Sequence, residues 1–220
     1  MRNLPLYLLF ILCVCSCDKT RTSSTSNFKK LLPDTSTTKY DYYNAAINLN
    51  NELNLNRIHN GVDSFEFRLW FGGMIDPSSL YIIKYVDSNW FATVIDYWQR
   101  VPERGEKGYM NQKYDYQGLN TIVDSSYTYR IVPSIPFSNM LDTLKHYQLK
   151  TIPSQKDIPD FVDGVADGFS YSIEISTKDY YKLFSYHSPN LQIDNFGYNS
   201  KMTQFLKFME RAFNRSLYLD

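Results

Sequence analysis

The side chains best suited to chemistry in this chain lie on two short segments of alternating polarity. Glu66, Arg68 and Trp70 alternate with apolar residues in the first segment, and Glu174 does so in the second. If the segments are neighbouring strands, one face of a sheet brings together two carboxylates, a guanidinium and an indole. Two carboxylates that share a site have their pKa values pushed apart, which suits acid–base hydrolysis of a glycan or peptide. An aromatic ring beside polar groups also suits ligand binding.

A simpler interpretation of these four residues is an outward, solvent-facing sheet surface with a cross-strand Arg–Glu pair. A hydrolase would need the carboxyl groups of Glu66 and Glu174 to lie about 5 to 9.5 Å apart. Without a further catalytic motif, we expect the four residues to bind a ligand and assign no catalytic residue.

Metal-binding patterns in the sequence are weaker. Four aspartates follow one another along a single loop: Asp157, Asp160, Asp163 and Asp167. Their oxygens could bind calcium, but their spacing departs from that of an EF-hand, and Asp-Gly pairs are common in turns. The histidines are scattered at His59, His146 and His187, without the spacing of a zinc site. We therefore predict no metal and no cofactor.

The elements that must position these residues follow from hydrophobic periodicity. Strict alternation predicts strands over 64–71 and 169–176, with phenylalanine and aliphatic residues on the inward faces. Apolar runs bounded by turn residues predict further strands over 80–86, 90–98, 127–132 and 180–186. Helical spacing predicts helices over 41–57, 138–147, with Ser138 as the N-cap, and 200–214.

This order of elements indicates an α+β fold. We expect an antiparallel sheet of roughly five to six strands, with about two or three helices packed mainly on one face. The polar segment 99–126 is long for a loop in a compact domain, and we expect it to be functional or mobile.

The N-terminus has the features of a signal peptide. Arg2 precedes an apolar run over 4–14 of about 11 residues, roughly half the length of a membrane-spanning helix. The run leads into Val14-Cys15-Ser16-Cys17, a branched residue and two small residues before a cysteine. A plain secretory signal or a short membrane helix would be the alternatives. We predict a signal peptide over 1–16 and a lipid-bearing Cys17.

The rest of the chain divides into two parts. Residues 17–39 are rich in serine and threonine and lack apolar periodicity, which predicts a flexible tether, and 40–220 has the length of one domain. Every cysteine lies at or before Cys17, so no disulfide or thiolate metal site is expected in the domain. The 23 basic and 23 acidic residues balance, which argues against a nucleic-acid partner.

With its cysteine motif, its Ser/Thr-rich tether and the strands 65–71, 80–86 and 169–176, the chain resembles small Bacteroidota-type lipoproteins that carry an α+β domain of unknown function. The resemblance implies acyl chains on Cys17 and a bilayer as the first partner. Asp18 is followed by Lys19 and Arg21, unlike the acidic stretch that directs such lipoproteins to the cell surface. We therefore expect an outer-membrane lipoprotein that faces the periplasm.

Three functional hypotheses follow. The first is a non-enzymatic binding or assembly module for an envelope protein or glycan, and it accords best with the absence of a catalytic motif. The second is a small envelope hydrolase that acts through Glu66 and Glu174. The third is an inhibitory or structural module that inserts the 99–126 loop into a partner.

Overall fold

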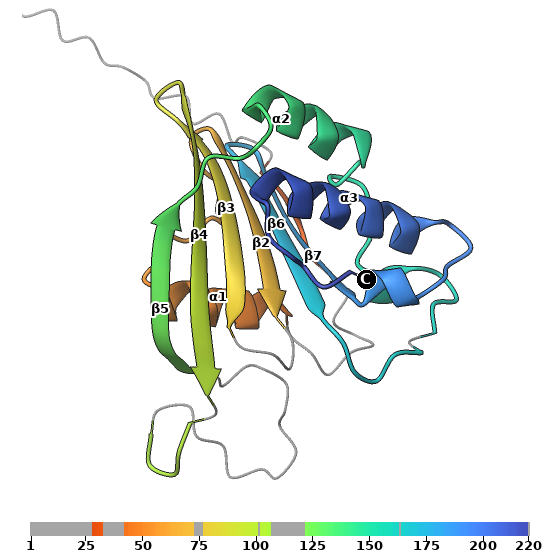
Figure 1. Ribbon diagram of the computed structural model, residues 1–220, viewed down its shortest axis with the longest axis horizontal. Helices are drawn as coiled ribbons and strands as arrows, with labels where there is room; N and C mark the ends of the chain where they lie inside the picture. The colour runs from red at the N-terminus through yellow and green to blue at the C-terminus, as the bar shows by residue number, and fades with distance from the viewer. Residues whose placement is uncertain are drawn as a thin grey trace, which may run out of the picture.

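The fold is built on a single sheet of seven strands in the order β1-β7-β6-β2-β3-β4-β5 (Figure 1). The computed structural model describes residues 28–32, 42–72, 77–100, 102–106, 122–162 and 164–219. The strands are β1 (Lys29–Leu31), β2 (Phe65–Gly72), β3 (Ser78–Val86), β4 (Asn89–Arg100), β5 (Ile122–Arg130), β6 (Ser170–Thr177) and β7 (Tyr180–His187).

The predicted α+β class is confirmed, but the predicted number of strands and the antiparallel sheet type are wrong. β1 pairs in parallel with β7, from Lys29 opposite Tyr180 to Leu31 opposite Lys182, whereas every other pairing is antiparallel. The prediction of a flexible tether is also wrong for these three residues. β1 is too short to show a period-2 pattern, and the neighbouring Phe28 packs against the cluster that contains Tyr181.

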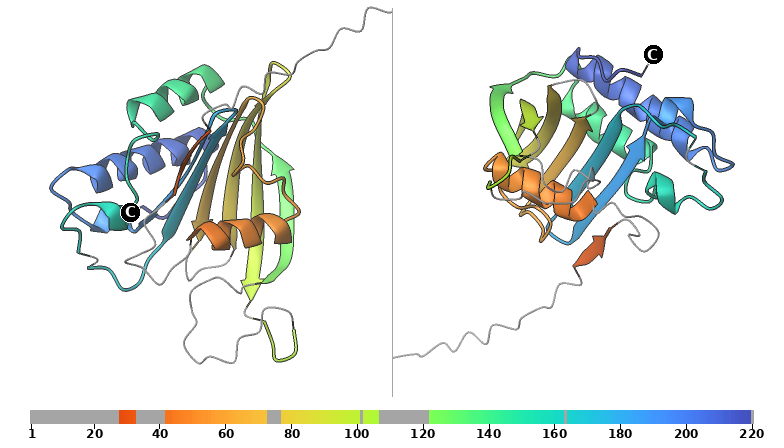
Figure 2. Two further views of the ribbon diagram at one scale, coloured as in Figure 1. Left: turned by 180° about the vertical axis from the view of Figure 1, so that it is seen from behind. Right: turned by 90° about the horizontal axis from the view of Figure 1, so that it is seen from below.

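Within the described residues, three α-helices cover the two faces of the sheet (Figure 2). α2 (Phe137–His146) and α3 (Tyr198–Phe213) lie on one face, and α1 (Tyr42–Glu52) lies on the other. Two short 3-10 turns, η1 (Gln155–Asp157) and η2 (Pro189–Leu191), precede β6 and α3. The expectation that helices pack mainly on one face therefore holds for α2 and α3 and fails for α1.

The main core fills the space between the sheet and α2 and α3. Inward residues of β2 and β6 meet the apolar face of α3, and Phe67 contacts Phe205 edge to face at 6.0 Å. The repeat that predicted the last helix supplies this face, with Met202, Phe205 and Leu206 fully buried. The sequence pattern thus assigned the inward face of the sheet correctly.

The opposite face of the sheet is buried as well. Trp70 and residues of β3 and β4 pack against Leu49 of α1 and against Leu53, which directly follows the helix. A second cluster joins Ala46 of α1 to Tyr181 of β7, with Phe28 against it. The strands that alternation predicted to be half exposed are consequently covered on both faces.

Two details of the predicted loops and helix ends also change. Pro136, rather than Ser138, occupies the N-cap of α2, and no side chain caps it. β4 extends to Arg100 and β5 begins at Ile122, so the predicted 99–126 loop is shorter, and residues 107–121 lie outside the described residues. Within the described ranges, no helix is both long and apolar enough to cross a bilayer.

Candidate functional site

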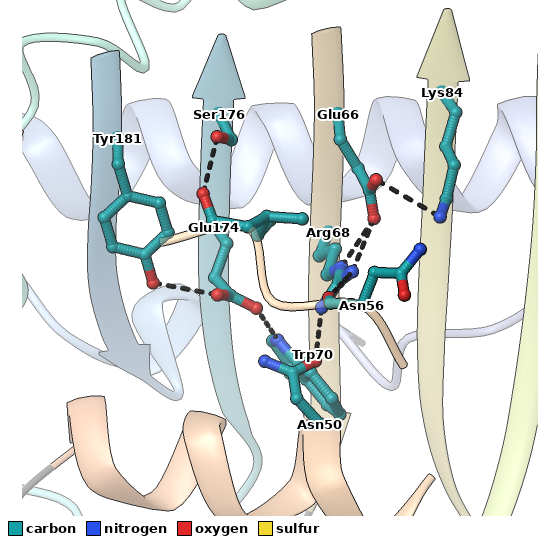
Figure 3. A network of polar contacts seen from close by, with 10 residues as sticks. Asn50, Asn56, Glu66, Arg68, Trp70, Lys84, Glu174, Ser176 and Tyr181 are labelled. Atoms are coloured by element: carbon teal, nitrogen blue, oxygen red, sulfur yellow. Dashed lines mark hydrogen bonds and ion pairs between the residues drawn. The ribbon is translucent and has the colours of Figure 1, made fainter. Parts of the chain in front are cut away.

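The predicted site residues lie together on the sheet face that α1 covers (Figure 3). Arg68 is opposite Glu174 across the β2–β6 ladder, and Trp70 is one pleat further along. Arg68 is 0% exposed and Glu174 is 1% exposed. The prediction that these side chains share one face is confirmed, but the expectation that the face is open to solvent is wrong, because α1 and the segment after it close over it.

Glu66 and Arg68 form an ion pair along their own strand. The Arg68 Nε donates to Glu66 Oε1 at 2.7 Å, and Lys84 Nζ of β3 lies 3.2 Å from Glu66 Oε2. The expected cross-strand pair between Arg68 and Glu174 does not form, since the guanidinium turns away from β6 and toward α1 (Figure 3).

The same guanidinium ties the sheet to the covering segment. Arg68 donates through Nη1 to the side-chain oxygen of Asn50 on α1, and through Nη2 to the Asn56 carbonyl at 2.7 Å. A buried guanidinium must have its donors satisfied, because an unpaired buried charge is strongly destabilising. Arg68 thereby fixes both the helix and the chain that leaves it over the sheet.

Glu174 has a different set of partners. Its Oε2 accepts a hydrogen bond from Trp70 Nε1 at 2.7 Å, and its Oε1 accepts one from the Tyr181 hydroxyl at 2.8 Å. Ser176, two residues along β6, donates to the Ile58 carbonyl at 2.7 Å. The buried polar side chains of this face thus join strands to one another or to the segment above them.

These contacts suit a structural role better than catalysis. Both carboxylates are buried, and each of their oxygens is already occupied by a donor from within the chain. A catalytic carboxylate must be within reach of a substrate proton. Neither Glu66 nor Glu174 meets that requirement while α1 is in place.

The sequence reasoning missed three partners in this network. The sequence pattern singles out neither Asn50, Tyr181 nor Lys84 as a partner of the predicted site residues. A signal exists for Lys84 alone, because a lysine inside a strand that is apolar on both faces requires a carboxylate close by, here Glu66.

Metal binding finds no support in the described part of the chain. There, no group of three or more histidine, cysteine or carboxylate side chains gathers in a way that could hold an ion. Asp163, one of the four loop aspartates, lies outside the described residues.

A second feature is a groove between α2 and the end of the sheet, with a volume of about 500 Å³. Leu141 and Leu144 of α2 form one wall, and Phe65 and Ile175 form the floor. The end of α2 and the turn after it complete the lining with the apolar Leu149 and four polar residues: Lys145, Gln148, Lys150 and Thr151. The groove is therefore an apolar surface with two cationic side chains beside it.

A third feature is a buried lysine beside a cavity of about 340 Å³. Lys182 of β7 donates through Nζ to the carbonyls of Leu149, at 3.1 Å, and Ile152, and its ammonium lies 4.6 Å from the centre of the Phe184 ring. Burial lowers the pKa of Lys182 to about 8, although the nearby Asp157 opposes the shift. With its donors directed to carbonyls, Lys182 holds the turn after α2 on the sheet.

Comparison with known proteins finds no family model, no curated protein and no solved structure that matches the chain.

Proposed function

We propose that the protein is a lipoprotein anchored in the outer membrane through Cys17 and facing the periplasm, and that it acts as a non-enzymatic binding module. The single observation that carries the binding role is the groove between α2 and the sheet. Concave, mostly apolar surfaces with a few polar groups are the usual form of binding sites.

The groove favours a protein segment over a glycan. Its floor and one wall are formed by Phe65, Leu141, Leu144 and Ile175, which offer no hydrogen bonds to sugar hydroxyls. A buried hydroxyl without a partner is unfavourable, whereas apolar side chains of a partner gain free energy when they leave water. Lys145 and Lys150 add positive charge at the rim, although Lys145 also lies 3.4 Å from the Asp142 carboxylate in an exposed ion pair. The proposed ligand is an apolar segment of an envelope protein with an acidic residue beside it.

The hydrolase alternative has little support. Its two carboxylates lie beneath α1, and their oxygens accept hydrogen bonds or ion pairs from buried neighbours. For Glu66 and Glu174 to act on a substrate, α1 would have to leave the sheet and the buried network would have to break.

The test of the binding role is site-specific photocrosslinking in native membranes. A photoreactive residue replaces Lys145 at the rim of the groove, and in a second strain it replaces Arg211, an exposed residue of α3. We expect one envelope protein to crosslink at position 145 and not at 211. Leu141→Asp should abolish that product, whereas the control Arg211→Asp should leave it unchanged. Equal products at both positions, or a product that survives Leu141→Asp, would contradict the groove as the binding surface.

The anchor is tested separately. Cys17→Ala should remove a metabolically incorporated acyl label and release the protein from the membrane fraction. If the variant keeps its label, the lipid is attached elsewhere in the chain, and that result leaves the outcome of the crosslinking unaffected.

A further inference from the structure

β5 forms one edge of the sheet, and within the described residues no element pairs with its outer side (Figure 1). Most of the strand is exposed, and Tyr127 at its centre is 65% exposed. An exposed strand edge presents unpaired N–H and C=O groups and is a template for another strand.

The pairing with β4 determines which backbone groups of β5 face outward. The Ile131 N–H donates to the Ala92 carbonyl, so in this antiparallel ladder the odd-numbered residues exchange hydrogen bonds with β4. The N–H and C=O groups of Ser126 and Thr128 consequently point away from the sheet. Only pairings that place even-numbered residues opposite one another can use these groups.

We propose that two copies of the chain pair antiparallel through β5, around a twofold axis at Tyr127. In this register Ser126 of one copy is opposite Thr128 of the other, so the outward backbone groups of both residues are used. Asp124 of each copy is then opposite Arg130 of the other. The same contact repeats on both sides of the axis, as a twofold interface requires.

Charge complementarity is what selects this register and a second copy as the occupant. Asp124 and Arg130 are both exposed, and they lie at equal distances on either side of Tyr127 in the sequence. Within its own chain Asp124 Oδ1 also lies 3.2 Å from Arg100 Nε, so the pair with Arg130 of the second copy must add to this contact or replace it. Opposite charges across an antiparallel pair stabilise it, and like charges destabilise it. If the axis lay at Ser126 or Thr128, even-numbered residues would still be opposite one another, but Asp124 would no longer be opposite Arg130 and both ion pairs would be lost.

Aromatic side chains support the same axis. The Tyr127 ring lies 5.5 Å from the Tyr129 ring of its own strand. At a twofold axis through Tyr127, the two Tyr127 rings become direct neighbours, with a Tyr129 ring beside each. Aromatic cross-strand pairs contribute to strand pairing, and tyrosine is enriched at the centres of interfaces.

Two features limit the strength of the contact. The register of β5 shifts between Trp98 and Gln99, which makes Asp124 the extra residue of a bulge, so its contribution comes from the side chain alone. One strand pair of this length also buries less than the roughly 1,200 Å² of a stable interface. The dimer is thus weak in dilute solution and forms where copies are concentrated on one surface.

The register is tested by disulfide trapping of the full chain in membranes. Single cysteines replace Ser126, Tyr127 or Thr128, and the chain without an introduced cysteine gives the background. At the proposed axis the two Cα atoms are about 4.5 Å apart, within the range that a disulfide spans. We expect the Tyr127→Cys dimer to form several-fold faster than the other two. Faster trapping at position 126 or 128 would overturn the register, and no trapping above background would overturn the dimer.

Charge reversal separates a specific interface from a chance encounter. Asp124→Arg or Arg130→Asp alone places like charges opposite one another and should reduce trapping of chains that also carry Tyr127→Cys. Coexpression of the two charge variants with different tags should give mixed dimers several-fold more often than like dimers, since both ion pairs are then restored. Equal amounts of mixed and like dimers would overturn the proposed pairing, and thermal unfolding of each variant checks that the fold is intact.

Discussion

Arg68 and Glu174 face each other across the β2–β6 ladder, yet they do not bind each other. Arg68 is held by Glu66, Asn50 and the Asn56 carbonyl, and Glu174 by Trp70 and Tyr181. Two polar systems thus lie side by side beneath α1. One ties the helix to the sheet, and the other joins β2, β6 and β7.

The first prediction concerns the contribution of Arg68 to stability. Arg68→Met keeps an unbranched apolar side chain but leaves Glu66 and Asn50 without their buried guanidinium partner. We expect the free energy of unfolding to fall by about 3–5 kcal/mol. Urea unfolding measures the change, with Arg211→Met on the exposed surface of α3 as the control, expected to be within about 0.5 kcal/mol of wild type. A loss below about 1 kcal/mol would mean that the network does not stabilise the fold.

The second prediction concerns the hydrogen bond between Trp70 and Glu174. Trp70→Phe removes the indole donor and leaves Glu174 Oε2 unsatisfied, which should lower the free energy of unfolding by about 1–3 kcal/mol. In a chain that already carries Glu174→Gln, the same change should have a smaller effect, because the charged acceptor is gone. A double-mutant cycle measures this coupling, and additive effects would argue against the bond.

The third prediction is a pH dependence that arises at the start of α3. Burial alone would raise the pKa of Asp194, but backbone N–H groups outweigh it and hold that pKa below its ordinary value of 3.8. The Phe196 and Tyr198 amides donate to Oδ1, and the Asn199 amide donates to Oδ2. A carboxyl whose pKa is lowered on folding stabilises the fold above its unfolded pKa, and the stabilisation is lost as pH falls through the folded value.

Asp194→Asn removes the charge while keeping one oxygen acceptor. The difference in free energy of unfolding between wild type and this variant should be roughly constant near neutral pH and should shrink as pH falls below about 4. Asp194→Ala also removes the acceptor and should lower stability by about 0.5–2 kcal/mol at neutral pH. If the difference in free energy of unfolding between wild type and Asp194→Asn does not change with pH, the charge of Asp194 does not stabilise the start of α3.

The fourth prediction separates backbone strain from crowding at Gly61. Gly61 has a φ of +97°, and an added Cβ would lie 3.0 Å from the Phe28 ring and 3.1 Å from the Thr177 carbonyl oxygen. Gly105 has a φ of +99° but nothing within 4 Å of the same position. Strain alone should lower stability by about 1–3 kcal/mol in either Gly→Ala variant. We expect Gly61→Ala to be the more destabilising, because it also displaces Phe28, and equal unfolding midpoints would contradict this packing.

Much of the sheet could be predicted because β2 and β6 carry the period-2 signal of a strand. Phe67 and Ile173 therefore fell on the correct face, and the helical repeat around Phe205 did the same for α3. α1 was harder to place, since its many asparagines give a weak contrast between its faces. For that reason the covering of Glu66, Arg68 and Glu174 could not be foreseen from the strand pattern.

Other parts of the structure depend on contacts between residues far apart in the sequence. β1 is three residues long, and its partner Tyr180 lies on the second-last element before α3. No local pattern around Lys29 or Lys30 indicates such a parallel pairing. The orientation of Arg68 toward Glu66 rather than Glu174 also involves a distant residue, because its guanidinium donates to Asn50 on α1.

The pairing of β1 with β7 sets a limit on the reach of the domain. Between Cys17 and Lys29 there are about 12 residue steps, and a polypeptide extends at most 3.3–3.6 Å per residue. A lipid on Cys17, as proposed, would keep this edge of the sheet within roughly 43 Å of the bilayer surface, whatever path the intervening residues follow. A binding partner would then have to approach the membrane, since the segment between Cys17 and Lys29 is too short to let the domain reach across the whole periplasm.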